Sequence, residues 1–161
     1  MDNLKLVLTG QYHAAMDMLR WAIEACPEDI WVGGNPPRSF WRLAYHTLFF
    51  THLYLEVREA DFQKWELHRD EVESDFERER LDATPYTKEE ILAYWQIVDD
   101  RIGPQIEKID LNSQDCGIPW YKIPKLDHVV MNLRHVQEHA GGLRDRLLEA
   151  GIDQGWATRR L

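Results

Sequence analysis

The decisive stretch of this chain is residues 132–143, NLRHVQEHAGGL, which carries His135 and His139 four residues apart. Four residues are slightly more than one helical turn, so both imidazoles leave the same face of a helix. Their Cβ atoms would lie about 6 Å apart, close enough for both rings to reach one divalent ion. Two ligands make a poor site, and the best third ligand is His46, in the stretch WRLAYHTLFF at 41–50. The pattern predicts a three-histidine metal site between two helices.

The same pattern has a simpler interpretation. Histidines four apart on a helix also occur by chance, as hydrogen-bonded or solvent-facing pairs. His128 lies two turns before His135, about 10 Å along the helix axis. That is too far to share the ion, so we place His128 at the edge of a pocket. His13, His52 and His68 have no partner at ligand spacing, and we expect them to have ordinary structural roles.

Four stretches show the apolar periodicity of helices. We expect them at about 3–25, 39–57, 87–109 and 124–150, with a loop at 27–37. Their ends carry the residues that begin or stop helices. Ser39 is placed as an N-cap, Thr87 and Glu90 match a capping box, Pro124 suits a first helical turn, and Gly151 suits a helix end.

Two connections between the expected helices are long. Residues 59–82 hold ten acidic and four basic residues, a net charge of −6, and we expect a solvated crossover rather than core. Residues 110–123 include Trp120 and Tyr121 beside a turn, which could form the lip of a pocket. Two such crossovers fit an all-α, antiparallel four-helix bundle whose order is not simple up-down-up-down.

Composition narrows the class of protein. The 161 residues suffice for one domain, and 44% are hydrophobic, as in ordinary globular chains. A formal charge of −9 argues against binding nucleic acid or anionic lipid. No stretch is apolar enough for a membrane span. Two cysteines, Cys26 and Cys116, fit a reducing cytoplasm, although the sequence leaves one long-range disulfide open.

The chain resembles the DinB/YfiT-like superfamily. The resemblance is carried by residues 41–50 around the isolated histidine, by 132–151 with His-x-x-x-His followed by AGGLRDRL, and by the ending EAGIDQGW at 149–156. It implies a single DinB-like four-helix-bundle domain over residues 1–161. It also implies one divalent transition metal, zinc or nickel, held by His46, His135 and His139.

The resemblance says less about the reaction. Characterised branches of the family include transferases and isomerases that use low-molecular-weight thiols. It therefore implies a metal-dependent hydrolase or a thiol S-transferase acting on a small molecule, with catalytic residues unassigned and a homodimer as in several relatives. The alternative is a non-catalytic metal- or ligand-binding bundle. An open coordination position, which three neutral imidazoles would leave, favours the enzyme, and a fourth protein ligand favours the alternative.

The neighbours of the three histidines complete the candidate site, together with Trp120 and Tyr121. Arg42 lies one turn before His46 and could meet an anionic substrate group or a carboxylate, or lie along the surface. Glu138 could orient an imidazole or be a solvated helix residue. Gly142 and the glycine before it cost on the order of 2 kcal/mol in a helix. Close helix packing or room for a ligand would justify that cost, and we expect close packing for at least one of the two.

Overall fold

All regular secondary structure is helical within the residues that the computed structural model describes, 3–33, 38–72 and 83–160. Five α-helices and two 3-10 helices make up its regular structure, and no strand forms within those ranges. The α-helices are α1 (Asn3–Ala25), α2 (Glu28–Val32), α3 (Phe40–Leu55), α4 (Lys88–Lys108) and α5 (Lys125–Glu149), and the 3-10 helices are η1 (Glu59–Asp61) and η2 (Asp70–Val72). The all-α prediction is confirmed.

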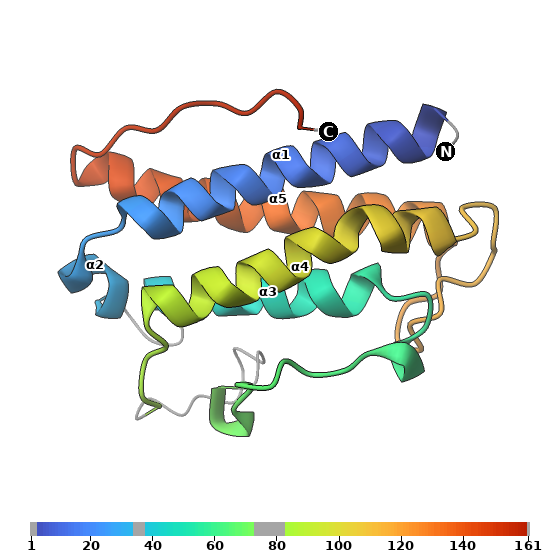
Figure 1. Ribbon diagram of the computed structural model, residues 1–161, viewed down its shortest axis with the longest axis horizontal. Helices are drawn as coiled ribbons and strands as arrows, with labels where there is room; N and C mark the ends of the chain where they lie inside the picture. Colours follow the sequence, from blue (N-terminus) through green and yellow to red (C-terminus); the bar gives the residue numbers. More distant parts are fainter. Residues whose placement is uncertain (1–2, 34–37, 73–82, 161) are drawn as a thin grey trace.

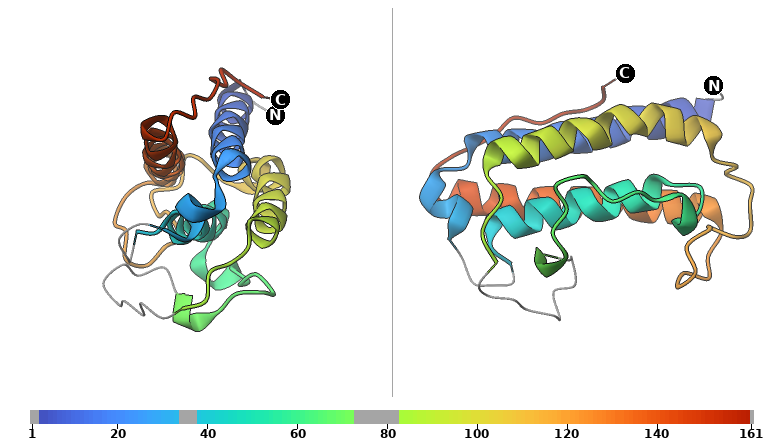
Figure 2. Two further views of the ribbon diagram at one scale, coloured as in Figure 1. Left: turned by 90° about the vertical axis from the view of Figure 1, so that its left-hand side faces the viewer. Right: turned by 60° about the horizontal axis from the view of Figure 1, so that its bottom comes forward.

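The four long helices lie side by side around a common core (Figure 1). α1 and α3 each pack against both α4 and α5. In Figures 1 and 2, α1 and α5 run in one direction and α3 and α4 run in the other. The neighbouring pairs α1–α5 and α3–α4 are therefore parallel, and the expectation of antiparallel helices is wrong for them. The long connection between α3 and α4 is the cause, because it returns the chain to the end at which α3 begins.

The predicted helix ends agree with the structure in part. The capping box is present, since the Glu90 amide donates to Thr87 Oγ1 at 3.1 Å and the Thr87 amide donates to Glu90 Oε2 at 2.8 Å. Gly151 follows α5 with a φ of +80°, the left-handed conformation that ends helices. Ser39 precedes α3 as expected, but its side chain makes no capping hydrogen bond. The prediction that Ser39 stands just before this helix is correct, and the prediction that its side chain caps the helix is wrong.

The expected loop at 27–37 contains the short helix α2 in its described part. Pro27 ends α1 and then stands at the N-cap of α2. Trp31 is the reason for this extra turn of helix, because its side chain is buried and its indole N–H donates to the Tyr86 carbonyl at 2.8 Å. A buried indole needs a hydrogen-bond acceptor as well as apolar neighbours. The glycines and prolines of this stretch predicted a loop, but the sequence did not predict the contact between Trp31 and Tyr86.

The acidic crossover contributes to the core, contrary to expectation. Trp65 and Val72 are buried, and the Trp65 ring stacks on Tyr94 with centroids 4.6 Å apart and planes at 3°. His68 is hydrogen-bonded to the hydroxyl of Tyr45 on α3. The described acidic residues of the crossover are exposed, whereas the Arg69 guanidinium lies over the Tyr86 ring, 3.8 Å from its centre. The rest of the predicted crossover, 73–82, lies outside the described residues.

Lys125 fixes the beginning of α5 against the end of α3. Its buried ammonium group donates to the carbonyls of Glu56, Val57 and Cys116 at 2.6–3.0 Å. These contacts use all three of its N–H donors. Burial lowers the pKa of Lys125, and the nearby Cys116, Asp115 and Glu56 oppose that shift. The contacts matter for the site, because they set the position of α5 relative to α3.

The chain after α5 lies along α1 as an extended segment (Figure 1). The Arg160 amide donates to the Gly10 carbonyl, and the Gln11 side chain donates to the Thr158 carbonyl. The Arg160 guanidinium pairs with Asp17 on α1 and with the buried Asp99 on α4. The tail thereby joins two helices that are distant from it in sequence.

Two further observations concern the membrane and redox predictions. Within the described part of the chain, none of the helices combines the length and apolarity that a bilayer crossing requires. Cys26 and Cys116 are both buried and both free, so the disulfide that the sequence left open does not form.

Candidate metal centre

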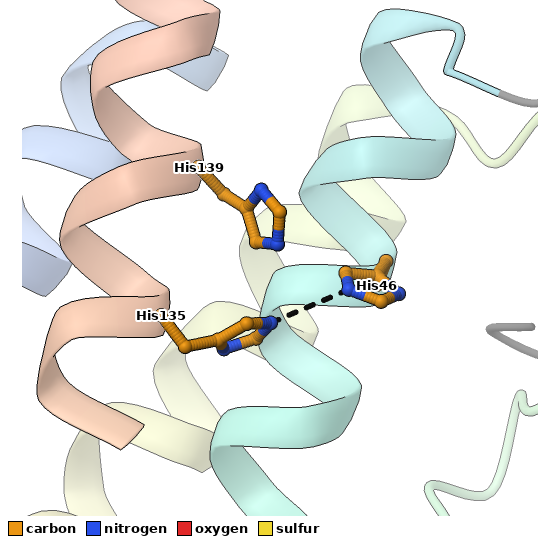
Figure 3. A group of neighbouring side chains, drawn as sticks. All are labelled: His46, His135 and His139. Atoms are coloured by element: carbon orange, nitrogen blue, oxygen red, sulfur yellow. Dashed lines mark hydrogen bonds between the residues drawn. The ribbon is translucent and has the colours of Figure 1, made fainter. Parts of the chain in front are cut away.

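The three predicted histidines meet where α3 packs against α5. His46 lies in the middle of α3, and His135 and His139 lie on successive turns of α5. Figure 3 shows the two α5 rings pointing across the space between the helices toward the His46 ring. The residue His46 is buried, and the other two are partly exposed. The site therefore begins in the core and extends to residues that are partly exposed to solvent.

The spacing of the ring nitrogens suits a single ion. One nitrogen from each histidine can be chosen so that all three lie within 4.8 Å of one another. The Nε2 atoms of His46 and His135 are 3.3 Å apart. Two ligands of a tetrahedral zinc ion, each at 2.0–2.1 Å, are separated by about 3.3–3.4 Å. In the metal-free protein the same pair can share a hydrogen bond, which Figure 3 marks with a dashed line.

The orientation of the rings also suits a shared ligand. Their centroids are 4.6–5.3 Å apart, and their planes are inclined at 59° to 88° to one another. Rings that stack face to face direct their nitrogens away from a common point, whereas inclined rings can direct them toward one. Among the described residues, no carboxylate or thiol belongs to this group. Neutral imidazole ligands alone would leave the charge of a dication uncompensated.

The environment keeps His135 and His139 neutral near pH 7. Burial, together with the neighbouring His139 and His46, lowers the pKa of His135 to about 3. Burial also lowers the pKa of His139, while the charge of Glu138 opposes the shift and Arg38 reinforces it. A neutral ring has one nitrogen with a free lone pair, which is the form that coordinates a metal. His135 and His139 therefore need not lose protons to bind an ion at neutral pH.

Aromatic residues of α3 line one side of the cluster. Phe50 packs edge-on against His46, with centroids 4.8 Å apart, and lies 6.0 Å from His135. Tyr54, one turn farther, lies 6.3 Å from the His135 ring. Sequence reasoning did not assign these two residues to the site. Their spacing of four and eight residues after His46 was the available signal, since it places them on the same face of the helix.

Two predicted neighbours lie beyond this aromatic side. The Tyr121 hydroxyl is 3.2 Å from that of Tyr54, whereas Trp120 is 51% exposed and contacts Tyr121. A cavity of about 580 Å³ opens between residues 58–60 and 114–123. Tyr121 lines this cavity, and none of the three histidines does. A role for Trp120 and Tyr121 in a pocket at the ion remains a prediction.

The other predicted neighbours differ in burial. Arg42 is buried, with its guanidinium 5.4 Å from the centre of the Trp41 ring, so the surface alternative for it is wrong. Glu138 is exposed. A Cβ atom added to Gly141 or Gly142 would meet no described atom within 4 Å, so the expectation of close helix packing at these glycines is wrong. The other explanation for Gly141 and Gly142, room for a ligand beside α5, remains.

The remaining histidines have partners in the protein or lie away from the cluster. His13 is hydrogen-bonded to Asp99 at 2.8 Å, and His52 to the Tyr94 hydroxyl at 3.1 Å. His68 lies between Tyr45 and an exposed aspartate, Asp70. His128 is fully buried between Tyr54 and Tyr121 instead of standing at a pocket edge.

Comparisons with protein-family models, with curated proteins and with solved structures gave no match. The converging nitrogens of the three histidines and the lowered pKa of His135 and His139 are what characterise the centre.

Proposed function

We propose that His46, His135 and His139 bind one divalent transition metal, zinc or nickel, in a DinB-like four-helix bundle. The observation that carries this proposal is the convergence of three ring nitrogens, with one pair at the separation that tetrahedral zinc requires. Three further features support it. The rings of His135 and His139 are neutral near pH 7, the three histidines come from two helices that pack directly, and two of the three are partly exposed to solvent.

We further propose that the centre is catalytic and acts on a small molecule, as a hydrolase or a thiol S-transferase. Three protein ligands are the number found in catalytic zinc sites, whereas structural sites usually have four. When bound there, the ion would lower the pKa of a water or thiol at its open coordination position and so supply a nucleophile at neutral pH. The alternative is a non-catalytic metal- or ligand-binding bundle. A fourth protein ligand would favour it, and no described His, Cys, Asp or Glu joins the three histidines.

The surroundings of the histidines indicate the chemistry of the substrate. Phe50 and Tyr54 offer an apolar surface on one side, and the α5 backbone at Gly142 leaves space on its own side. A ligand with a thiol or anionic group next to a small apolar part matches these surfaces. The overall charge of −9 disfavours nucleic acid as the substrate. Two free buried cysteines suit a reducing compartment, and we place the protein in the cytoplasm.

The proposal is tested by the metal content of purified protein. The wild type should carry about one equivalent of zinc or nickel per chain, measured by elemental analysis after dialysis. His46→Ala, His135→Ala and His139→Ala should each lose most of it, because two imidazoles make a poor site. His128→Leu is the matched control, since it removes a buried histidine from the same helix outside the cluster. Full retention in the triple alanine variant would exclude this ligand set.

A further inference from the structure

A second set of polar residues lies beside the histidine cluster on α5. Asn132 and His128 are both fully buried, three and seven residues before His135 on the same helical face. Four atoms of this face have no hydrogen-bond partner among the described residues: both ring nitrogens of His128, Oδ1 of Asn132 and Nδ1 of His135. Buried polar atoms without partners are rare in proteins, so each one needs an explanation.

Two of these atoms are complementary. Nε2 of His135 faces His46, so a neutral His135 that offers this nitrogen to an ion must carry its proton on Nδ1. The resulting Nδ1–H is a buried donor that needs an acceptor. Oδ1 of Asn132 is a buried acceptor that needs a donor. Residues three apart on a helix have Cβ atoms about 5–6 Å apart, within reach of a hydrogen bond through one water molecule.

The orientation of the Asn132 amide supports this pairing. Its Nδ2 donates to the Thr51 carbonyl at 3.4 Å. A backbone carbonyl can only accept, so the nitrogen of the amide must face Thr51 and the oxygen must face elsewhere. Oδ1 therefore takes no part in the Thr51 contact and stays free for another donor. His128 has the wrong spacing for the same role, because seven residues separate it from His135 by about 10 Å along the axis.

Glu138 was the orienting residue that the sequence suggested, and the structure favours Asn132 over it. Glu138 is exposed, and Nδ1 of His135 makes no hydrogen bond to it. An exposed carboxylate is free to move and is surrounded by competing water. A buried amide is held in one orientation by its packing.

We propose that Asn132 is a positioning residue for His135. Its Oδ1 accepts a hydrogen bond from Nδ1–H of His135 through one buried water, and this bond fixes the tautomer that presents Nε2 to the ion. The inference rests on the proposed function, since it assigns the residue that prepares one ligand of that centre. Partners of this kind that hold metal-bound histidines typically change metal affinity 10- to 100-fold when they are removed.

The first test compares zinc affinities by chelator competition at pH 7.5. Asn132→Leu should weaken zinc binding about 10- to 100-fold, because no acceptor is left for Nδ1–H. Asn132→Asp keeps an acceptor and should stay within about threefold of the wild type. His128→Leu is the matched control, an equally buried change from polar to apolar on the same face, and should also stay within about threefold. Equal affinity in Asn132→Leu and the wild type, or an equal loss in His128→Leu, overturns the proposal.

The second test reads the tautomer directly and does not need the metal. Long-range ¹⁵N–¹H NMR of the metal-free wild type at pH 7.5 should show His135 protonated on Nδ1. Asn132→Leu should shift the population toward Nε2–H. A wild-type His135 protonated mainly on Nε2 overturns the proposal, whether or not the leucine variant folds. If Asn132→Leu shifts the tautomer as expected but the wild type binds no zinc, the proposed function fails and the control of the His135 tautomer by Asn132 stands.

Discussion

The Nε2 atoms of His46 and His135 lie 3.3 Å apart, although 89 residues separate them in the chain. The approach follows from the packing of α3 against α5 and from the position of each histidine on the facing side of its helix. Lys125 reinforces it, because its ammonium group ties the first turn of α5 to the two residues that follow α3. A metal ion at this point would join two helices that already touch.

We expect zinc to raise the melting temperature of the protein. A ligand that binds only the folded state stabilises it by about 2.7 kcal/mol at 100 times its Kd. For a chain of this length that corresponds to a shift of roughly 5–10 °C. Calorimetry with and without zinc checks this, with His46→Ala as the control that should show no shift. An equal shift in that variant would mean that zinc stabilises the protein from another site.

We expect small thiols to coordinate the ion directly. Three histidine ligands leave a position open, and the cluster contains no carboxylate among the described residues to neutralise the ion. Cobalt-substituted protein titrated with a small thiol should gain the near-ultraviolet absorption of a cobalt–thiolate bond. If neither thiols nor small anions change the spectrum of a coordinatively saturated cobalt, the non-catalytic alternative replaces the enzyme proposal.

The stability of the metal-free fold should fall as pH decreases from about 6.5 to about 4. Burial lowers the pKa of His52 to about 4, with Arg101 contributing, and lowers the pKa of His128 to about 4, with Lys125 contributing. In the unfolded chain both groups have a pKa near 6.5. Between these values the unfolded state binds more protons, so acidification favours unfolding by up to about 1.4 kcal/mol per pH unit for each histidine. Above pH 6.5 both are neutral in either state and the loss is absent.

Urea denaturation at pH 7.5, 6.0 and 5.0 measures this dependence. His128→Leu should reduce the slope by the share of one histidine, about 1.4 kcal/mol per pH unit. It should also leave stability at pH 7.5 unchanged or higher, because it replaces a buried imidazole without hydrogen bonds by an apolar side chain. Identical slopes in the two proteins would show that His128 is not buried in its neutral form.

The C-terminal tail should stabilise the helices through Arg160. Burial alone would raise the pKa of Asp99, but hydrogen bonds from His13 and Arg160 outweigh it and hold the pKa below its usual value. Arg160→Met leaves Asp99 and Asp17 without their shared cation and should cost about 1–3 kcal/mol. Arg159→Met is the control, since its exposed side chain should contribute less than about 0.5 kcal/mol. Equal stabilities for the two variants, measured by denaturant unfolding, would contradict the role of Arg160.

Local patterns predicted the helices and their ends well, because those depend on neighbouring residues. The range of α1 and the capping box at Thr87 were both correct, and Gly151 follows the end of α5 as expected. The errors arose where a distant contact decides the structure. Trp31, in the short helix that replaces part of an expected loop, is hydrogen-bonded to Tyr86. Trp65, in the acidic crossover, stacks on Tyr94. Neither partner is near in sequence.

The sequence by itself determined the chemistry of the candidate site. The four-residue spacing of His135 and His139 places both rings on one face of a helix, and His46 is an isolated histidine on another. Only the tertiary structure decided that the three nitrogens converge, that Phe50 and Tyr54 flank them, and that Asn132 is buried beside His135 with an unpartnered oxygen. The physical reason is the distance along the chain over which each effect acts. Helical periodicity acts over a few residues, whereas convergence and burial depend on how α3 and α5 pack.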